Sequence, residues 1–286
     1  MLNLPVIKKM AALTGLEYKK LIRQKLHYTG LGVVLFFTCL SSLGFIMHRM
    51  RNAKKKIEGE AAAELLNGIA FSMTCLVPAI YVLFPMIISI FTATSMAGEL
   101  QNGQMRTMLL RPVSRWNVFF SRFFMMSFYS FFLVIALLFV SYSCGSVMFG
   151  ATGDVVIFGE IFLRNGSRYI LPEKVVFTKL LLMYSFACFS TIYLVAMNMM
   201  ISALTKKVSH TIVISLGIYY TSYILSSLSF MKHIHAFLPT RYLDIWRFAV
   251  VRDIPWDQLF HDCTIDICYI VSFLVIGGIA FNMTEV

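Results

Sequence analysis

Residues 94–122 read TSMAGELQNGQMRTMLLRPVSRWNVFFSR, a polar and basic stretch between two long apolar segments. Because the sequence on either side is apolar enough for a membrane, this compact charged stretch must lie at a membrane surface or contact a partner there. Met105–Leu110 is apolar enough to form a short amphipathic helix. Arg111-Pro112 ends that helix, since a proline disfavours α geometry in the residue before it. We interpret residues 94–115 as a docking loop between two spans.

The residues around this loop predict where it turns and where the next helix begins. Ser114 is a good N-cap, with Asn117 at the third helical position. Gly98 and Gly103 flank Glu99, the one carboxylate of the stretch, and predict a turn on each side of it. The chain is therefore expected to leave one span, turn, and enter the next span directly.

The composition predicts an all-α integral membrane protein. The chain has 286 residues, 58% hydrophobic residues and a mean hydropathy of +0.75, whereas soluble domains are about 45 to 50% apolar. A helix needs about 20 apolar residues to cross a bilayer. Six segments of one 1–286 transmembrane domain meet this length and are expected to form six transmembrane helices: Tyr28–Met47, Ile69–Ala93, Trp116–Val147, Val175–Leu204, Val208–Phe230 and Thr264–Phe281.

Two segments outside the spans have compositions typical of a membrane interface. Residues 1–27 mix six basic side chains with aliphatic ones, which predicts an interfacial helix; a basic flank that orients the first span is the alternative. Residues 231–261 are semi-polar, and the prolines at 239 and 255 bracket an expected helix over 240–254. We expect this segment to lie outside the spans, between the fifth and the sixth.

The second span contains Pro78 and Pro85, seven residues apart and so on nearly the same face. Each proline removes a backbone hydrogen bond and can kink the helix. The kinks are interpreted either as hinges of a transporter or as ordinary prolines of a membrane helix.

One part of the chain resembles a known family. Glu99, Gly103, Leu109-Leu110 and Pro112-Val113-Ser114-Arg115, followed at once by a span, resemble the cytoplasmic loop between helices two and three of the ABC-2 type permeases. These are membrane subunits of one class of ATP-binding cassette transporters. The usual threonine after the glycine is displaced to Thr107. The resemblance implies a coupling helix that rests in a groove of an ATPase subunit. It also implies short external helices between spans five and six, which dip part-way into the bilayer and close the outer end of the path.

The resemblance and the positions of the residues together assign contacts with the ATPase. The apolar run would pack into the ATPase, the charges would fix its register, and the cap would join the loop to the third span. The residues assigned to ATPase coupling are Glu99, Met105, Arg106, Met108, Leu109, Leu110, Arg111, Pro112, Ser114 and Arg115. The short turn Thr205-Lys206-Lys207 is a candidate second contact. The alternative is a membrane-interface loop with basic anchors and no partner.

The implied partners are two ABC ATPase subunits and a second copy or a paralogue of this chain. The chain has no GxxxxGK[ST] phosphate loop, so ATP and Mg would be bound by the ATPase, and this chain would have no cofactor and would not itself be an enzyme. The net charge of +11 is spread over short interhelical segments, which indicates contact with lipid headgroups and no nucleic acid.

The orientation expected in the plasma membrane rests on the resemblance. Lys and Arg residues divide almost evenly between the two sides, so the positive-inside rule does not decide. A cytoplasmic N-terminus is expected because the Glu99 loop must face the compartment of the ATPase.

The remaining functional classes find less support in the sequence. An ATPase-independent channel or secondary transporter usually has ionisable residues near the membrane midplane, and here Asp262 and Asp266 are expected at the outer start of the sixth span. His233, His235, His261 and Asp262 fit no zinc spacing, so no metal site is expected. A structural membrane subunit remains an alternative.

The chain is therefore interpreted as an exporter subunit. The absence of midplane charge and the aromatic-rich spans favour an amphiphilic or hydrophobic cargo, such as a peptide antibiotic, a drug or a lipid-like molecule. The phenylalanines of the third span recur at helical spacing, at positions 120, 124, 128 and 131. They are expected to face lipid or another helix rather than to line a cargo path.

Overall fold

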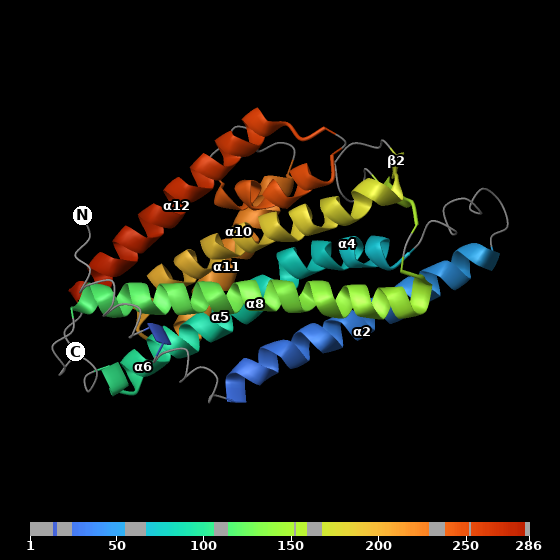
Figure 1. Ribbon diagram of the computed structural model, residues 1–286. Helices are drawn as coiled ribbons and strands as arrows, with labels where there is room; N and C mark the ends of the chain where they lie inside the picture. Colours follow the sequence, from blue (N-terminus) through green and yellow to red (C-terminus); the bar gives the residue numbers. More distant parts are fainter. Residues whose placement is uncertain are drawn as a thin grey trace.

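The computed structural model is a bundle of long helices (Figure 1). It describes residues 14–15, 25–54, 67–105, 114–151, 153–158, 168–228, 238–251 and 253–283. Within these residues, six helices are long and apolar enough to cross a membrane, which confirms the predicted helical, six-span character. They are α2 (Lys25–Lys54), the continuous helix from α4 to α6 (Gly68–Gln101), α8 (Arg115–Phe149), α10 (Glu173–Thr205), α11 (Val208–Ser227) and α12 (Trp256–Asn282).

The second span is one helix with two wider π-helical segments. Its parts are α4 (Gly68–Pro78), η1 (Ala79–Leu83), α5 (Phe84–Thr92), η2 (Ala93–Ala97) and α6 (Gly98–Gln101). The first π segment follows from the sequence, because Pro85 has no N–H to donate to the carbonyl four residues earlier and its ring crowds that carbonyl. The predicted disturbance of this span is therefore present as a π segment between the two prolines.

The loop after the second span is shorter than predicted. The helix continues through Gly98 to Gln101, so the turn expected at Gly98 is absent and the loop does not begin at Thr94. The turn at Gly103 is present, with a positive φ of 69°, a conformation that glycine adopts without steric cost.

Helix α10 lies at the centre of the packing. It contacts α12, α8, α5 and α11 directly, and most of its length is buried inside the bundle. Helix α2 packs on α8 and α4 and is largely exposed, as expected for a helix that faces lipid. Most of the interior is therefore built around one helix, and the outer helices leave apolar surface for the membrane.

The 3₁₀ helix η5 (Pro239–Ala249) inserts between the spans. It packs on α10, α12 and α11. The Ser190 hydroxyl, about half-way along α10, donates to the Leu243 carbonyl (3.1 Å), and the Lys179 ammonium, nearer the start of α10, donates to the Val251 carbonyl (2.7 Å). The segment therefore reaches the middle of the bundle and then rises toward the start of α10.

The segment between the fifth and sixth spans differs from the prediction at both ends. The expected helix over 240–254 is the shorter 3₁₀ helix η5, and residues 231–237 lie outside the described residues. Helix α12 begins at Trp256, directly after Pro255, so residues 256–261 belong to the sixth helix. Asp266, expected at the outer start of the sixth span, therefore lies ten residues inside it.

A β-hairpin, which the sequence analysis did not predict, lies at one end of the bundle. Strand β1 (Val155–Phe158) pairs antiparallel with β2 (Arg168–Leu171). The Asn67 side chain donates to the Gly153 carbonyl (2.9 Å) and caps α4 by accepting from Ala70 N (3.0 Å). The hairpin is thus tied to the start of the second span.

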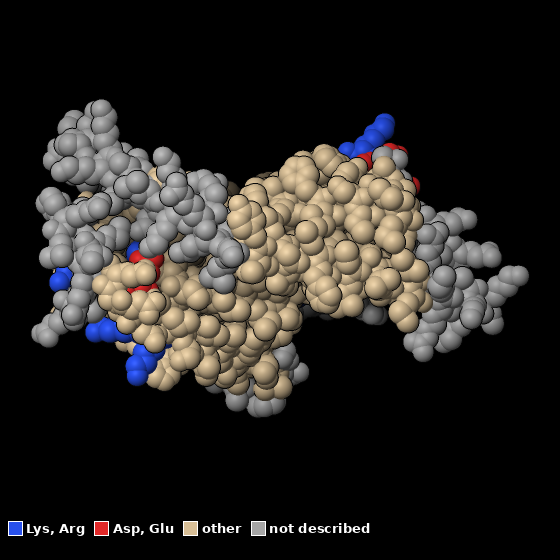
Figure 2. All heavy atoms as spheres, turned by 90° about the horizontal axis from the view of Figure 1, so that it is seen from below, with Lys and Arg blue, Asp and Glu red and all other residues tan. Residues whose placement is uncertain are grey.

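The surface agrees with a membrane-spanning bundle. On the face shown in Figure 2, Lys, Arg, Asp and Glu side chains gather toward the two ends, with uncharged atoms between them. Phe124 and Phe128 of the third span are exposed, Phe128 by 61%. These two side chains of the aromatic stripe therefore point outward, as expected for side chains that face lipid, whereas Phe120 and Phe131 are half-buried.

Helices α4 and α8 approach closely where two glycines meet. A Cβ added at Gly145 would lie 2.9 Å from the Cα and carbonyl oxygen of Gly68 and from the Phe71 ring. Since the first two of these are backbone atoms of the other helix, the two helices would have to separate to admit a methyl group.

Gly145→Ala is expected to destabilise the protein by about 1–3 kcal/mol, because overpacking forces the backbones apart. Gly217 on α11 has open space around it, so Gly217→Ala is the matched control and is expected to be neutral or stabilising by up to about 1 kcal/mol through helix propensity. Thermal unfolding of the purified variants in detergent measures both. Equal melting temperatures for the two variants would contradict this packing.

Candidate functional site

A buried ion pair joins the end of the second span to the start of the third. The Arg122 guanidinium on α8 donates through Nη2 to the Glu99 carboxylate on α6, and their side chains are 0% and 8% exposed. Arg122 Nη1 also donates to the Ser95 carbonyl in η2 (2.5 Å). The carboxylate and the carbonyl thus share one cation, which fixes the two helices at either side of the loop.

This pair changes the part that Glu99 is expected to play. The sequence analysis assigned Glu99 to the docking surface, but its carboxylate is buried against Arg122. For Arg122, the sequence indicated only a charge near a helix end. The signal that points to it is the single carboxylate of an otherwise basic stretch, since a buried carboxylate needs a cation beside it. The contact of Glu99 with an ATPase stays a prediction.

The described parts of the loop are held at both of its ends. Met105, expected on the docking surface, is 0% exposed and packs within the chain. Ser114 Oγ accepts from Asn117 N (3.2 Å), which confirms the predicted N-cap. The Arg115 guanidinium donates to the Asn282 carbonyl at the end of α12 (2.9 Å). The assigned residues outside the described part of the chain are Arg106, Met108, Leu109, Leu110, Arg111 and Pro112.

The turn between the fourth and fifth spans lies beside this loop. Val208 N donates to the Gln101 side chain (3.3 Å), and Lys206 and Lys207 are exposed next to it. Lys206 ends α10 in the left-handed conformation, with a φ of 56°. These residues belong to one surface, which we call the Glu99 end and define by Gln101–Gly103, Ser114, Arg115, Lys206 and Lys207.

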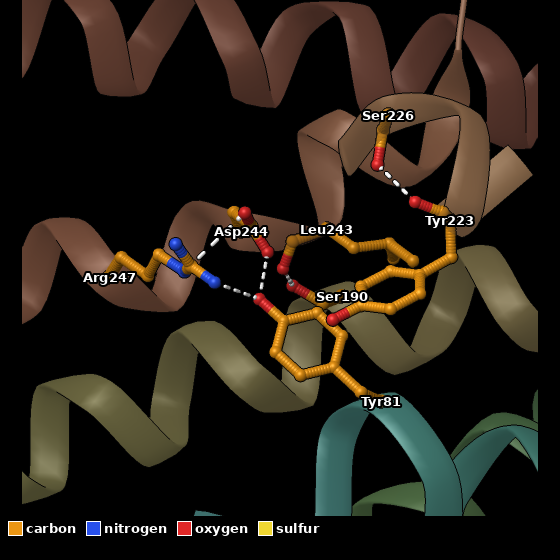
Figure 3. A network of polar contacts seen from close by, with 7 residues as sticks. All are labelled: Tyr81, Ser190, Tyr223, Ser226, Leu243, Asp244 and Arg247. Atoms are coloured by element: carbon orange, nitrogen blue, oxygen red, sulfur yellow. Dashed lines mark hydrogen bonds and ion pairs between the residues drawn. The ribbon is translucent and has the colours of Figure 1, made fainter. Parts of the chain in front are cut away.

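A second charged contact lies deeper in the bundle, on the first π segment (Figure 3). The Tyr81 hydroxyl in η1 donates to the Asp244 carboxylate and accepts from Arg247 Nη2 (2.7 Å). Arg247 Nε lies 3.4 Å from the other Asp244 oxygen. The Arg247 guanidinium also stacks over the rings of Tyr81 and Trp246, at 5.7 and 5.3 Å from their centroids. We call these residues the Tyr81 network.

The Tyr81 network fastens η5 to the second span. Asp244 and Arg247 come from η5, and the Tyr81 ring also lies against the Tyr223 ring of α11, with centroids 5.0 Å apart. The network therefore connects three elements through one tyrosine. The interior was expected to lack charge because the spans lack it, and the charges are instead supplied by the inserted segment between spans five and six.

Both charged contacts lie on the same irregular span. Ser95 is in the π segment η2, and Tyr81 is in the π segment η1. Segments of this kind inside α-helices occur frequently at functional sites. The second span therefore carries one charged contact at the Glu99 end and another near the middle of the bundle.

The candidate metal ligands do not assemble into one group in the described residues. His261 Nδ1 lies 3.2 Å from its neighbour Asp262, and His233 and His235 lie outside the described residues. Among the residues that the structure describes, no three His, Cys, Asp or Glu side chains come together as metal ligands.

Comparison with known proteins gives one family. The model of a family described as protein of unknown function (DUF2705) matches residues 20–286. No curated protein matches the chain.

Glu99→Gln is expected to lower the free energy of unfolding by about 3–5 kcal/mol, because the Arg122 charge stays buried without its counter-ion. The double variant Glu99→Gln/Arg122→Met is expected to be more stable than Glu99→Gln alone, since it buries no unpaired charge. Unfolding of the three proteins in detergent provides the comparison, with Arg115→Met as the control for a half-buried arginine. Losses that simply add in the double variant would show that the two side chains are not coupled.

Tyr81→Phe is expected to cost about 1–3 kcal/mol, because it leaves the largely buried Asp244 and Arg247 side chains, 18% and 17% exposed, short of a hydrogen bond while it keeps the ring. Tyr223→Phe is the matched control, since Tyr223 contacts Tyr81 through its ring. The same unfolding measurement applies. A Tyr223→Phe loss as large as that of Tyr81→Phe would mean that the Tyr81 hydroxyl has no special part in holding η5.

Proposed function

The chain belongs to the DUF2705 family, and we propose that it is the membrane-spanning permease subunit of an ATP-binding cassette transporter of the ABC-2 type. One observation carries this proposal. The loop that resembles the coupling loop of those permeases connects two helices that the buried Glu99–Arg122 pair joins. Such an anchor is what a docking loop needs if a force on the loop is to move the spans.

The anchored loop suggests a path from an ATPase to the interior. An ATPase that moves residues 102–113 would pull on α6 and α8 together, because Arg122 holds Glu99 and the Ser95 carbonyl at once. The second span would carry this movement to η1, where Tyr81 contacts η5. ATP hydrolysis at one end would thereby change the packing of the inserted segment in the middle of the bundle.

The partners follow from this role. The Glu99 end would face the cytoplasm, with the N-terminus on the same side of the plasma membrane, and ATP with Mg would be bound by two separate ATPase subunits. The exposed Lys206 and Lys207 lie beside the loop and would form a second contact with the ATPase. This chain would supply half of the translocation unit, and a second copy or a paralogue would supply the other half.

Export of an amphiphilic or hydrophobic cargo remains part of the proposal, but fewer observations favour it than the sequence alone offered. Phe124 and Phe128 of the third span face outward, so they do not line an interior path. The interior also contains the Tyr81 network and Asp266, so it is less apolar than the spans alone indicate. The apolar composition of the spans therefore still favours such a cargo, although polar groups also lie near the middle of the bundle.

An ion-coupled secondary transporter is the second candidate function. A buried acidic side chain inside a span is the feature that such proteins use to bind their coupling ion, and Asp266 is one, at 0% exposure within α12. A partner ATPase separates the two functions, since a secondary transporter has none.

Capture of the tagged chain from its native membranes tests the proposal. We expect a protein with a GxxxxGK[ST] loop to co-purify, with ATPase activity that orthovanadate inhibits. Arg106→Glu/Arg111→Glu is expected to abolish this capture, because it reverses the charge of the docking loop. Arg168→Glu/Lys174→Glu makes the same charge change at the hairpin end and is expected to leave capture intact. A crosslinked preparation that yields no ATPase with the unaltered chain would contradict the proposal.

A further inference from the structure

Asp266 is a buried acidic side chain that the proposed coupling path does not use. The residue is 0% exposed, and neither of its carboxylate oxygens has a hydrogen-bond partner. It lies ten residues after Trp256, at which α12 begins, so it is about 15 Å along the helix at 1.5 Å per residue. Asp266 therefore lies inside the sixth span.

The surroundings of Asp266 offer no cation among the described residues. Helix α10 contributes Tyr193, which lies within electrostatic range of Asp266, and α12 itself contributes Cys263. The neighbouring Tyr269 faces Tyr242 of η5, with ring centroids 6.3 Å apart. All four of these side chains are uncharged in their ordinary form at neutral pH.

The charged groups of the elements packed on α12 are engaged at other places. In η5, Asp244 and Arg247 bind each other and Tyr81. The Lys179 ammonium of α10 donates to the Val251 carbonyl. Arg115 of α8 donates to the Asn282 carbonyl at the far end of α12. Each of these contacts directs its charge to a group other than Asp266.

A bare carboxylate in this setting is far more costly than a carboxylic acid. An unpaired neutral polar group also costs free energy when it is buried, but far less than an isolated ionised carboxylate does. A proton removes this charge and needs a single oxygen to bind, whereas a metal cation needs several ligands. The geometry therefore suits a proton better than any larger cation.

We propose that Asp266 is a proton-binding site inside the sixth span, occupied while α12 packs on α10. When these helices separate and water reaches the carboxyl group, the proton leaves to water and the carboxylate remains. Proton binding at Asp266 thus favours the packed arrangement of α12. This inference does not rest on an ATPase partner, and its test uses the isolated chain.

Infrared spectroscopy of the full chain, purified in detergent, tests the site directly. At neutral pH we expect a carbonyl band of a protonated carboxylic acid, which shifts when the protein contains aspartate labelled with ¹³C in the carboxyl group. The band is expected to vanish in Asp266→Asn and to persist in Asp262→Asn, the matched control one helical turn earlier. A labelled wild-type protein without this band at neutral pH would overturn the inference, and that measurement needs no variant.

The pH dependence of unfolding provides a second readout. The unfolded chain exposes Asp266, which then ionises above about pH 4, while the folded chain keeps the proton. Relative to Asp266→Asn, the folding equilibrium constant of the wild type should therefore fall about tenfold for each pH unit above that point, until the folded site releases its proton. The control Asp262→Asn should follow the wild type. Parallel pH profiles for wild type and Asp266→Asn would contradict the proposal, as would loss of the carbonyl band when Na⁺ is added at constant pH.

Discussion

A charged group buried in this bundle needs partners inside the protein, because the surrounding hydrocarbon offers none. Arg122 meets this constraint with the Glu99 carboxylate and the Ser95 carbonyl. Asp244 and Arg247 meet it with each other and with Tyr81. Both solutions use π segments of the second span, and they fix the loop at one end and η5 near the centre. Removing one member of such a set leaves its partners buried and unsatisfied, so the arrangement of these elements depends on the sets remaining complete.

The sequence predicts those features that depend on local pattern. Hydropathy locates the six spans because about 20 apolar residues are needed to cross a bilayer, and capping chemistry identifies Ser114. Pairings over long distances leave no local pattern, so the Arg122 partner of Glu99 was not predicted. An insertion between spans five and six was expected from the family resemblance alone, and the contacts of η5 within the bundle were not predicted. The hairpin was not predicted, because its strands of four residues each carry little local pattern. The start of α12 was placed too late because polar residues of its first turns are tolerated where a helix begins.

The second span connects the two charged contacts mechanically. A helix that carries Tyr81 at one π segment and Ser95 at the other moves both contacts when it tilts or slides. Helix α10 contacts this span, α12 and η5, so it supports the moving parts from the centre. Asp266 lies on α12, which carries neither of the two charged contacts. A proton there acts on the packing of α12 rather than on the loop. An ATPase and a proton would therefore influence the bundle through different helices.

The role as a permease subunit depends on which protein touches the Glu99 end. A photo-crosslinking amino acid at Asn102, exposed beside the Gly103 turn, can be compared in intact cells with the same amino acid at Ala151, exposed at the hairpin end. If the chain is driven by an ATPase, Asn102 will crosslink to a protein that contains a GxxxxGK[ST] loop, and Ala151 will not. Crosslinking of such an ATPase from Ala151, or from neither position, would contradict this role.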